Sequence, residues 1–191
     1  MTVQAWQQIL SSAELDGPVV SATGPSSLLP PQALHTVAPD DWWLGKLLKI
    51  EACINFGNVV TAQPTFTLDL KFGATTGIWN SGAILTSTTA HTALPCYLEL
   101  LLSCQVTGSA GKLKGQGKIT GRPFLLTGAG AIADLTTSGV PVIPLPQTTP
   151  AQGASFNTNV SQQIDLTVAL SVANAANLVQ LTQYALYATE L

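Results

Sequence analysis

The stretch from Phe156 to Val172 constrains the fold of this chain more than any other part of the sequence. Its even positions are mostly apolar, and its odd positions are polar or small. A period of two residues predicts a β-strand with one face on a core and the other face turned to water or to a neighbouring subunit. The alternation weakens near Gln162, where we expect the strand to bend or break.

The same alternation recurs along much of the chain after residue 41. Strands are predicted within 42–56, 65–72, 83–86, 96–107, 113–120 and 178–191, with a further short one near 124–127. Clusters of Gly, Asn and Ser separate them, as is typical of turns. The pattern predicts an all-β fold, a jelly-roll-like antiparallel β-sandwich, with an immunoglobulin-like sandwich as the alternative.

Charged residues are scarce in this chain. Asp, Glu, Lys and Arg make up 9% of its 191 residues, whereas about 25% is usual for a soluble domain. Apolar residues make up 46%, which is enough for a substantial core. A surface with so few charges is typical of a protein whose faces are covered by other protein, and a secreted domain rich in Ser and Thr is the alternative.

Charge and hydropathy also bear on the partners. The net charge of −3 gives no basic patch for phosphates, so we expect no nucleic-acid partner. No apolar run approaches the ~20 residues of a membrane helix, so we expect no membrane partner. The first ten residues lack the basic start and long apolar run of a signal peptide, which predicts folding in a cytoplasm.

The sequence contains no group of residues that predicts catalysis, a cofactor or a metal site. Cys96 and Cys104 share the inward parity of one strand and are expected to be buried, whereas Cys53 lies on an outward parity. His35 and His91 have no second ligand at a spacing typical of zinc sites. The acidic residues are scattered, so no carboxylate pair for hydrolysis is predicted. We therefore expect a non-enzymatic protein.

Residues 1–41 are predicted to form an extended N-terminal arm outside a sandwich domain that spans 42–191. The arm holds five of the twelve prolines, and proline disfavours both helices and central strands. A short helix is expected over Val3–Ser11. Its Trp6 is a candidate protein-contact residue, either on a neighbouring molecule or on the end of the chain's own sandwich. We expect this arm to serve attachment more than folding.

A second irregular region, the long Pro-rich loop 128–155, lies within the sandwich domain. Its run Val-Pro-Val-Ile-Pro-Leu-Pro alternates proline with apolar residues, which favours polyproline II or an extended clamp. Val142, Ile143 and Leu145 are candidate protein-contact residues, because exposing them to water would be costly in a monomer. A loose surface loop is the alternative.

Four segments support a resemblance to a class of known proteins. They are the Trp42-Trp43 entry into a strand, the GQGKITGRP strand, the QIDLTVALSVAN strand and the closing NLVQLTQYALYATEL strand. With them, residues 42–191 resemble the jelly-roll virion proteins of tailed bacteriophages, of the capsid decoration (cement) or head-fibre-base type. The resemblance implies a homotrimeric virion component, made in the host cytoplasm, that binds the major capsid protein on the capsid surface.

The expected function is therefore decoration and stabilisation of a capsid by bridging its subunits. Outward strand positions with small or uncharged side chains are expected at the trimer contacts: Thr65, Thr67, Ser161, Gln163, Thr167, Ala169 and Ser171. The alternative is a receptor- or glycan-binding fibre or tail module. In that case several of four aromatic residues would line one groove: Trp42, Trp43, Trp79 and Tyr97.

Overall fold

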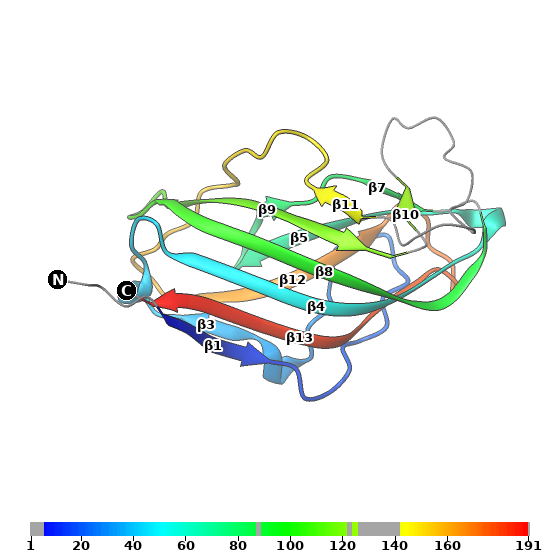
Figure 1. Ribbon diagram of the computed structural model, residues 1–191, viewed down its shortest axis with the longest axis horizontal. Helices are drawn as coiled ribbons and strands as arrows, with labels where there is room; N and C mark the ends of the chain where they lie inside the picture. The colour runs from blue at the N-terminus through cyan, green and yellow to red at the C-terminus, as the bar shows by residue number, and fades with distance from the viewer. Residues whose placement is uncertain (1–5, 87–88, 122–123, 126–141, 191) are drawn as a thin grey trace.

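Two antiparallel β-sheets pack face to face in the computed structural model, which describes residues 6–86, 89–121, 124–125 and 142–190 (Figure 1). The six-stranded sheet has the order β1-β13-β4-β8-β9-β11. The seven-stranded sheet has the order β10-β7-β5-β12-β2, with β3 beside β12 and β6 beside β5. The prediction of an all-β sandwich is confirmed.

The strands of the six-stranded sheet are β1 (Trp6–Ser12), β4 (Leu47–Asn58), β8 (His91–Val106), β9 (Lys112–Thr120), β11 (Val142–Leu145) and β13 (Leu178–Glu190). Those of the other sheet are β2 (Ser26–Ser27), β3 (His35–Val37), β5 (Thr65–Phe72), β6 (Thr75–Asn80), β7 (Ile84–Thr86), β10 (Phe124–Leu125) and β12 (Gln162–Leu170). Three short 3-10 helices, η1 (Pro31–Ala33), η2 (Pro39–Asp41) and η3 (Val60–Ala62), complete the described elements, none of which is a helix long and apolar enough to cross a membrane.

The strands pair in a nested order that defines the topology. The first strand, β1, pairs with the last, β13, while β2 and β3 pair with β12. Further inward along the chain, β4 pairs with β8 and β5 pairs with β7. This nesting, divided between two sheets, is the arrangement of a jelly roll. Strands β9 and β11 extend the six-stranded sheet beyond β8.

The core lies between the sheets and follows from the alternation in the sequence. In β5, every second residue from Phe66 to Phe72 is buried, and the same holds in β4 from Leu48 to Phe56. Aromatic contacts join the two sheets at both ends of this layer. Phe56 of β4 meets Phe66 of β5 with ring centroids 5.5 Å apart. At the other end, Trp42 lies 5.5 Å from Phe72.

The central strand of the opening prediction is shorter than its pattern. The ladder of β12 begins at Gln162, where the sequence predicted a break. Before it, Phe156 is buried and forms an isolated bridge with Gly111 at the start of β9. Residues 156–158 therefore bind to the opposite sheet, because the aromatic ring of Phe156 completes the cluster of Trp42 and Phe72.

The predicted helix over Val3–Ser11 is wrong for its described part. Trp6–Ser12 form a strand that pairs antiparallel with β13, from Trp6 opposite Glu190 to Ser12 opposite Ala185. An isolated helix of this length is marginal in water, whereas the open edge of β13 offers a full set of backbone hydrogen-bond partners. Tertiary pairing thus overrides the local preference.

The prediction of an N-terminal arm outside the sandwich is also wrong for residues 6–41. This segment supplies β1, β2 and β3, and it places Leu28, Leu29 and Val37 in the core. Its prolines are accommodated because Pro31 and Pro39 begin 3-10 helices, where a missing N–H costs nothing. The segment is therefore part of the fold.

The Pro-rich loop requires a partial correction. Residues 128–141 of the predicted loop lie outside the described residues. Val142–Leu145 form β11, an edge strand that pairs with β9. Ile143 and Leu145 are fully buried in the chain's own core, so the prediction that these two side chains contact a partner is wrong. An edge strand tolerates Pro144, because one side of its backbone has no neighbour in the sheet.

Because the N-terminal segment is part of the core, truncation of the Leu28 side chain should strongly destabilise the fold. Leu28→Ala should reduce the free energy of unfolding by about 2–5 kcal/mol, because it removes fully buried methyl groups and leaves a cavity. Leu15→Ala is the matched control in the same segment: Leu15 is exposed, so the change should stay within about 0.5 kcal/mol. Urea denaturation followed by circular dichroism measures both. Equal, small effects would show that residues 6–41 are a detachable arm.

The N-terminal segment helps to bury one carboxylate, that of Asp165. Asp165 of β12 is half-buried, and the hydroxyl of Ser27 in β2 donates a hydrogen bond of 2.6 Å to its Oδ1. Burial raises the pKa of Asp165, against the smaller lowering effects of Ser27 and Lys71. Because the pKa is higher in the folded chain than in the unfolded one, ionisation of Asp165 destabilises the fold at neutral pH.

Asp165→Asn should therefore raise the melting temperature at pH 7, since the amide oxygen still accepts from Ser27 without a buried charge. This gain in melting temperature should shrink as the pH falls through the folded-state pKa of Asp165. The protonated carboxyl group of the wild-type chain is then as neutral as the amide group of the variant. Thermal melts of both chains between pH 7 and pH 4 measure the difference, with exposed Asp16→Asn as the control. A lower melting temperature for Asp165→Asn at pH 7 would contradict this reading.

Candidate functional site

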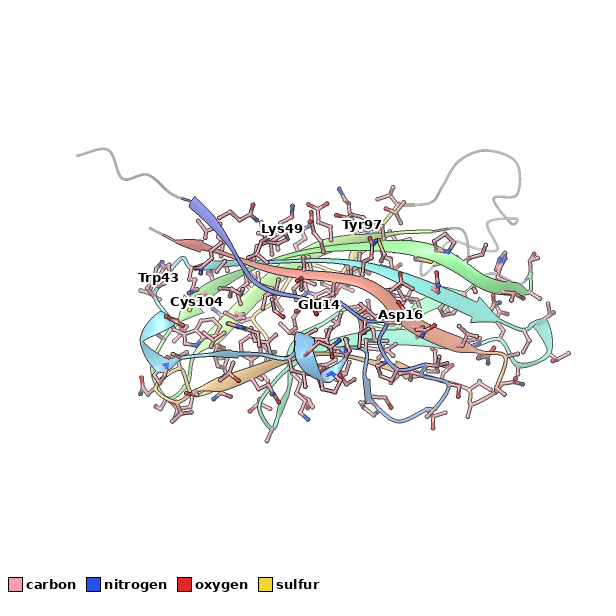
Figure 2. All side chains as sticks on the ribbon, turned by 90° about the horizontal axis from the view of Figure 1, so that it is seen from below. Glu14, Asp16, Trp43, Lys49, Tyr97 and Cys104 are labelled. Carbon is pink, nitrogen blue, oxygen red and sulfur yellow. The ribbon has the colours of Figure 1, made fainter. Side chains whose placement is uncertain are left out.

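The outer face of the six-stranded sheet is a regular surface built by long strands. Cross-strand register places one row of side chains across it, because residues opposite each other in a ladder share a face. Ile9 lies opposite Tyr187, Tyr187 opposite Lys49, and Lys49 opposite Leu101. Figure 2 shows Lys49 and Tyr97 directed away from the second sheet. We call this surface the β4–β8 face.

A compact charge cluster occupies the middle of the β4–β8 face. The Lys49 ammonium lies 2.8 Å from a carboxylate oxygen of Glu51 and 3.6 Å from one of Glu99. The Lys118 ammonium lies 2.9 Å from the other carboxylate oxygen of Glu99. Two cations and two anions from three adjacent strands therefore neutralise one another.

The cluster keeps its charges over a wide pH range. Hydrogen bonding to Lys49 lowers the pKa of Glu51, to which Tyr97 and Tyr187 also contribute. The Lys118 ammonium lowers the pKa of Glu99 in the same way. Partial burial and the nearby Glu51 raise the pKa of Tyr97 to about 12. The arrangement thus holds fixed charges and hydroxyls near neutral pH, which suits binding better than proton transfer.

Two shallow hollows lie on either side of this cluster. The first, of about 510 Å³, follows β8 and β9 and is lined by Leu101, Glu99 and Lys114, with Pro150 among the other lining residues. The second, of about 380 Å³, lies over β4 and β13 and includes Cys53, Tyr97 and Gln183. Each hollow is bordered by one carboxylate of the cluster, Glu99 for the first and Glu51 for the second.

Exposed apolar side chains surround the charges on the same face. Leu101 is 49% exposed and Ile9 is 61% exposed. Val142, the remaining candidate of the Pro-rich loop, is 56% exposed and lies opposite Thr120, which in turn lies opposite Tyr97. Val142 therefore stays a candidate contact residue on this face. Trp6 lies at the start of β1, and its side chain is outside what the structure describes.

The opposite outer face, on β5 and β12, is partly used by the chain itself. Thr167 is buried, and its hydroxyl donates to the carbonyl oxygen of Asp69 at 3.2 Å. The Asp69 carboxylate accepts from the backbone of Gly77 and the side chain of Asn80, which fixes the β5–β6 hairpin. Of the predicted trimer contacts on this side, Ser161, Gln163 and Ser171 are exposed, and Thr65, Thr67 and Ala169 are partly buried.

The aromatic residues that would form a sugar-stacking platform are not brought together. Trp42 and Trp79 are buried in the core. Trp43 is partly exposed, with the Lys46 ammonium 4.2 Å from the centre of its ring. Tyr97 lies on the β4–β8 face. No single groove can therefore present several of these four rings to a glycan.

The cysteines and histidines occupy separate places. Cys96 and Cys104 are buried, as their parity predicted, and burial raises the pKa of Cys96 to about 12. Cys53 is partly exposed opposite Tyr97. His35 of β3 lies opposite Ile164 of β12, and burial lowers the pKa of the His35 imidazole. Within the described ranges, no three His, Cys, Asp or Glu side chains are grouped as a metal site would require.

Comparison with known proteins gives no relative. No protein-family model, no curated protein and no solved structure matches this chain.

Sequence reasoning missed the charge cluster. Lys49, Glu51, Glu99 and Lys118 all lie at outward positions of predicted strands. Their parity was available in the sequence, but their proximity depends on the register between β4, β8 and β9. A one-residue change of register would turn these side chains to the other face of the sheet. Only the ladder decides that they form one cluster.

Proposed function

We propose that this chain is a structural virion protein of a tailed bacteriophage, which decorates the capsid surface and stabilises it by bridging major capsid subunits. The observation that supports it best is the β4–β8 face. A self-neutralised charge cluster, ringed by exposed apolar residues, is suited to permanent burial against another protein. The identity of the partner rests on the resemblance of residues 42–191 to phage jelly-roll proteins.

Further support comes from the composition and from the fixed state of the charges. A chain with 9% charged residues has little to keep it solvated as a free monomer. The carboxylates of the cluster are paired and their pKa values are lowered, so neither of them is a general acid near neutral pH. A non-catalytic role, with a homotrimer as the assembled form, is part of the proposal.

A stable bridging contact needs about 1,200–2,000 Å² of buried surface, and more if it is permanent. The β4–β8 face is formed by long strands that include β8, with 16 residues, and β13, with 13. The extent of such a face suits an interface of this size.

The test compares wild-type chain with Leu101→Asp in binding to purified capsids that lack the protein. Leu101→Asp replaces an exposed apolar side chain of the β4–β8 face with a charged one and should abolish co-sedimentation while the chain stays folded. Val60→Asp is the matched control, because Val60 is 57% exposed on η3, away from this face. Binding by both variants at the wild-type level would remove the face from the proposal.

Quantification in purified virions tests the location itself. The number of copies per particle should equal the number of equivalent sites that the symmetry of the capsid creates, or a multiple of it. Presence in lysates of infected cells and absence from virions would refute a decoration role.

A further inference from the structure

The free edge of β1 differs from every other described edge of the two sheets. β1 is the first strand in its sheet, with β13 on one side and no described strand on the other. Proteins usually protect such edges with charged side chains, prolines, very short strands or bulges. Trp6–Ser12 contains no charged residue and no proline. Its one irregularity is the register shift between Ile9 and Ser11, so Trp6–Ile9 remains a regular, unprotected edge.

The other edges carry protection. In the six-stranded sheet, the opposite edge strand β11 has four residues and contains Pro144. In the second sheet, the terminal strands β10 and β2 have two residues each, and β3 has three. The remaining edge strand, β6, has six residues, but Ala154 already donates its backbone N–H to the carbonyl oxygen of Gly77 in the middle of β6. None of these edges therefore offers a free ladder that matches β1 in another molecule. A contact through β1 is therefore expected to use the same strand on both sides, which is a two-fold arrangement.

We infer that β1 pairs antiparallel with β1 of a second copy of this chain, which joins two six-stranded sheets into one continuous sheet. Gln7 and Gln8 are exposed and lie at the middle of the regular part of the edge. Antiparallel pairing about this point brings uncharged glutamine amides together across the new ladder. Figure 2 views the molecule from this side, with β1 in front of β13.

The distribution of charge favours this occupant. Glu14 and Asp16 follow β1 directly, and both are exposed. In an antiparallel pair the acidic segments of the two copies lie at opposite ends of the new ladder, so that they do not repel each other. Exposed Leu15 and Val19 follow β1 in the chain and add apolar area. The pairing uses the edge, and not the β4–β8 face, so it is separate from the proposed capsid contact.

The experiment uses two charge variants of the full chain. Gln7→Lys/Gln8→Lys and Gln7→Glu/Gln8→Glu each place like charges opposite one another in any antiparallel register near these residues. Each variant alone should weaken pairing by about tenfold or more and halve the mass found by sedimentation. An equimolar mixture of the two should restore the wild-type mass, because opposite charges then meet across the edge.

Hydrogen exchange gives a second readout of the same contact. Amides of Trp6–Ser12 that face the free edge should be protected in concentrated wild-type protein and should exchange faster on dilution. Combined with the proposed homotrimer, this two-fold contact joins two trimers, so the wild-type mass is expected to be that of two copies or of six. The inference is overturned if the wild-type protein sediments as one copy or as three, if both variants keep the wild-type mass, or if the mixture does not restore it. If Leu101→Asp alone loses assembly and both β1 variants keep the wild-type mass, the copies meet through the β4–β8 face. The β1 edge is then not the contact.

Discussion

The structure depends on one apolar layer shared by two sheets. Strands β4 and β5 contribute alternate residues to it, and aromatic contacts close it at both ends, with Phe56 and Phe66 at one and Trp42, Phe72 and Phe156 at the other. Burial of such side chains is the dominant favourable term in folding. The outer faces of both sheets follow from it, because a strand that turns one face to this layer turns its other face outward.

Closure of that layer requires the two ends of the chain to meet. Strand β1 completes the sheet beside β13, and residues 28–37 cover the region beside β12. The N-terminal segment has little periodicity of its own, because its strands are short and proline separates them. It is ordered by partners more than a hundred residues away in sequence, as in the bond of Ser27 to Asp165. Local composition is a poor guide to a segment that is held in this way.

The β4–β8 face and the β1 edge follow from the same architecture but act through different physics. On the face, fixed charges neutralise one another and leave apolar side chains around them, which favours lateral burial against a partner of complementary shape. At the edge, backbone donors and acceptors are available, and these favour the addition of a strand. A protein with both surfaces has two separate means of contact, one through side chains and one through the backbone of an edge strand.

Alternation in the sequence by itself determined the long strands and the inward or outward parity of their residues. It correctly placed β5, the buried Cys96 and Cys104, and a break near Gln162, where β12 begins. It could do so because a period of two is a local property, imposed by the pleat of a strand. The sandwich class followed from the number of such strands.

Only the tertiary structure decided which strands are neighbours and in which register they pair. That decision made a strand of Trp6–Ser12, buried Ile143 and Leu145 in the chain's own core, and gathered Lys49, Glu51, Glu99 and Lys118 into one cluster. The reason is physical: backbone hydrogen bonds between strands are nearly independent of side-chain identity, so the sequence of one segment does not name its partner. The partner is selected by the burial of the whole apolar layer, to which all strands contribute at once.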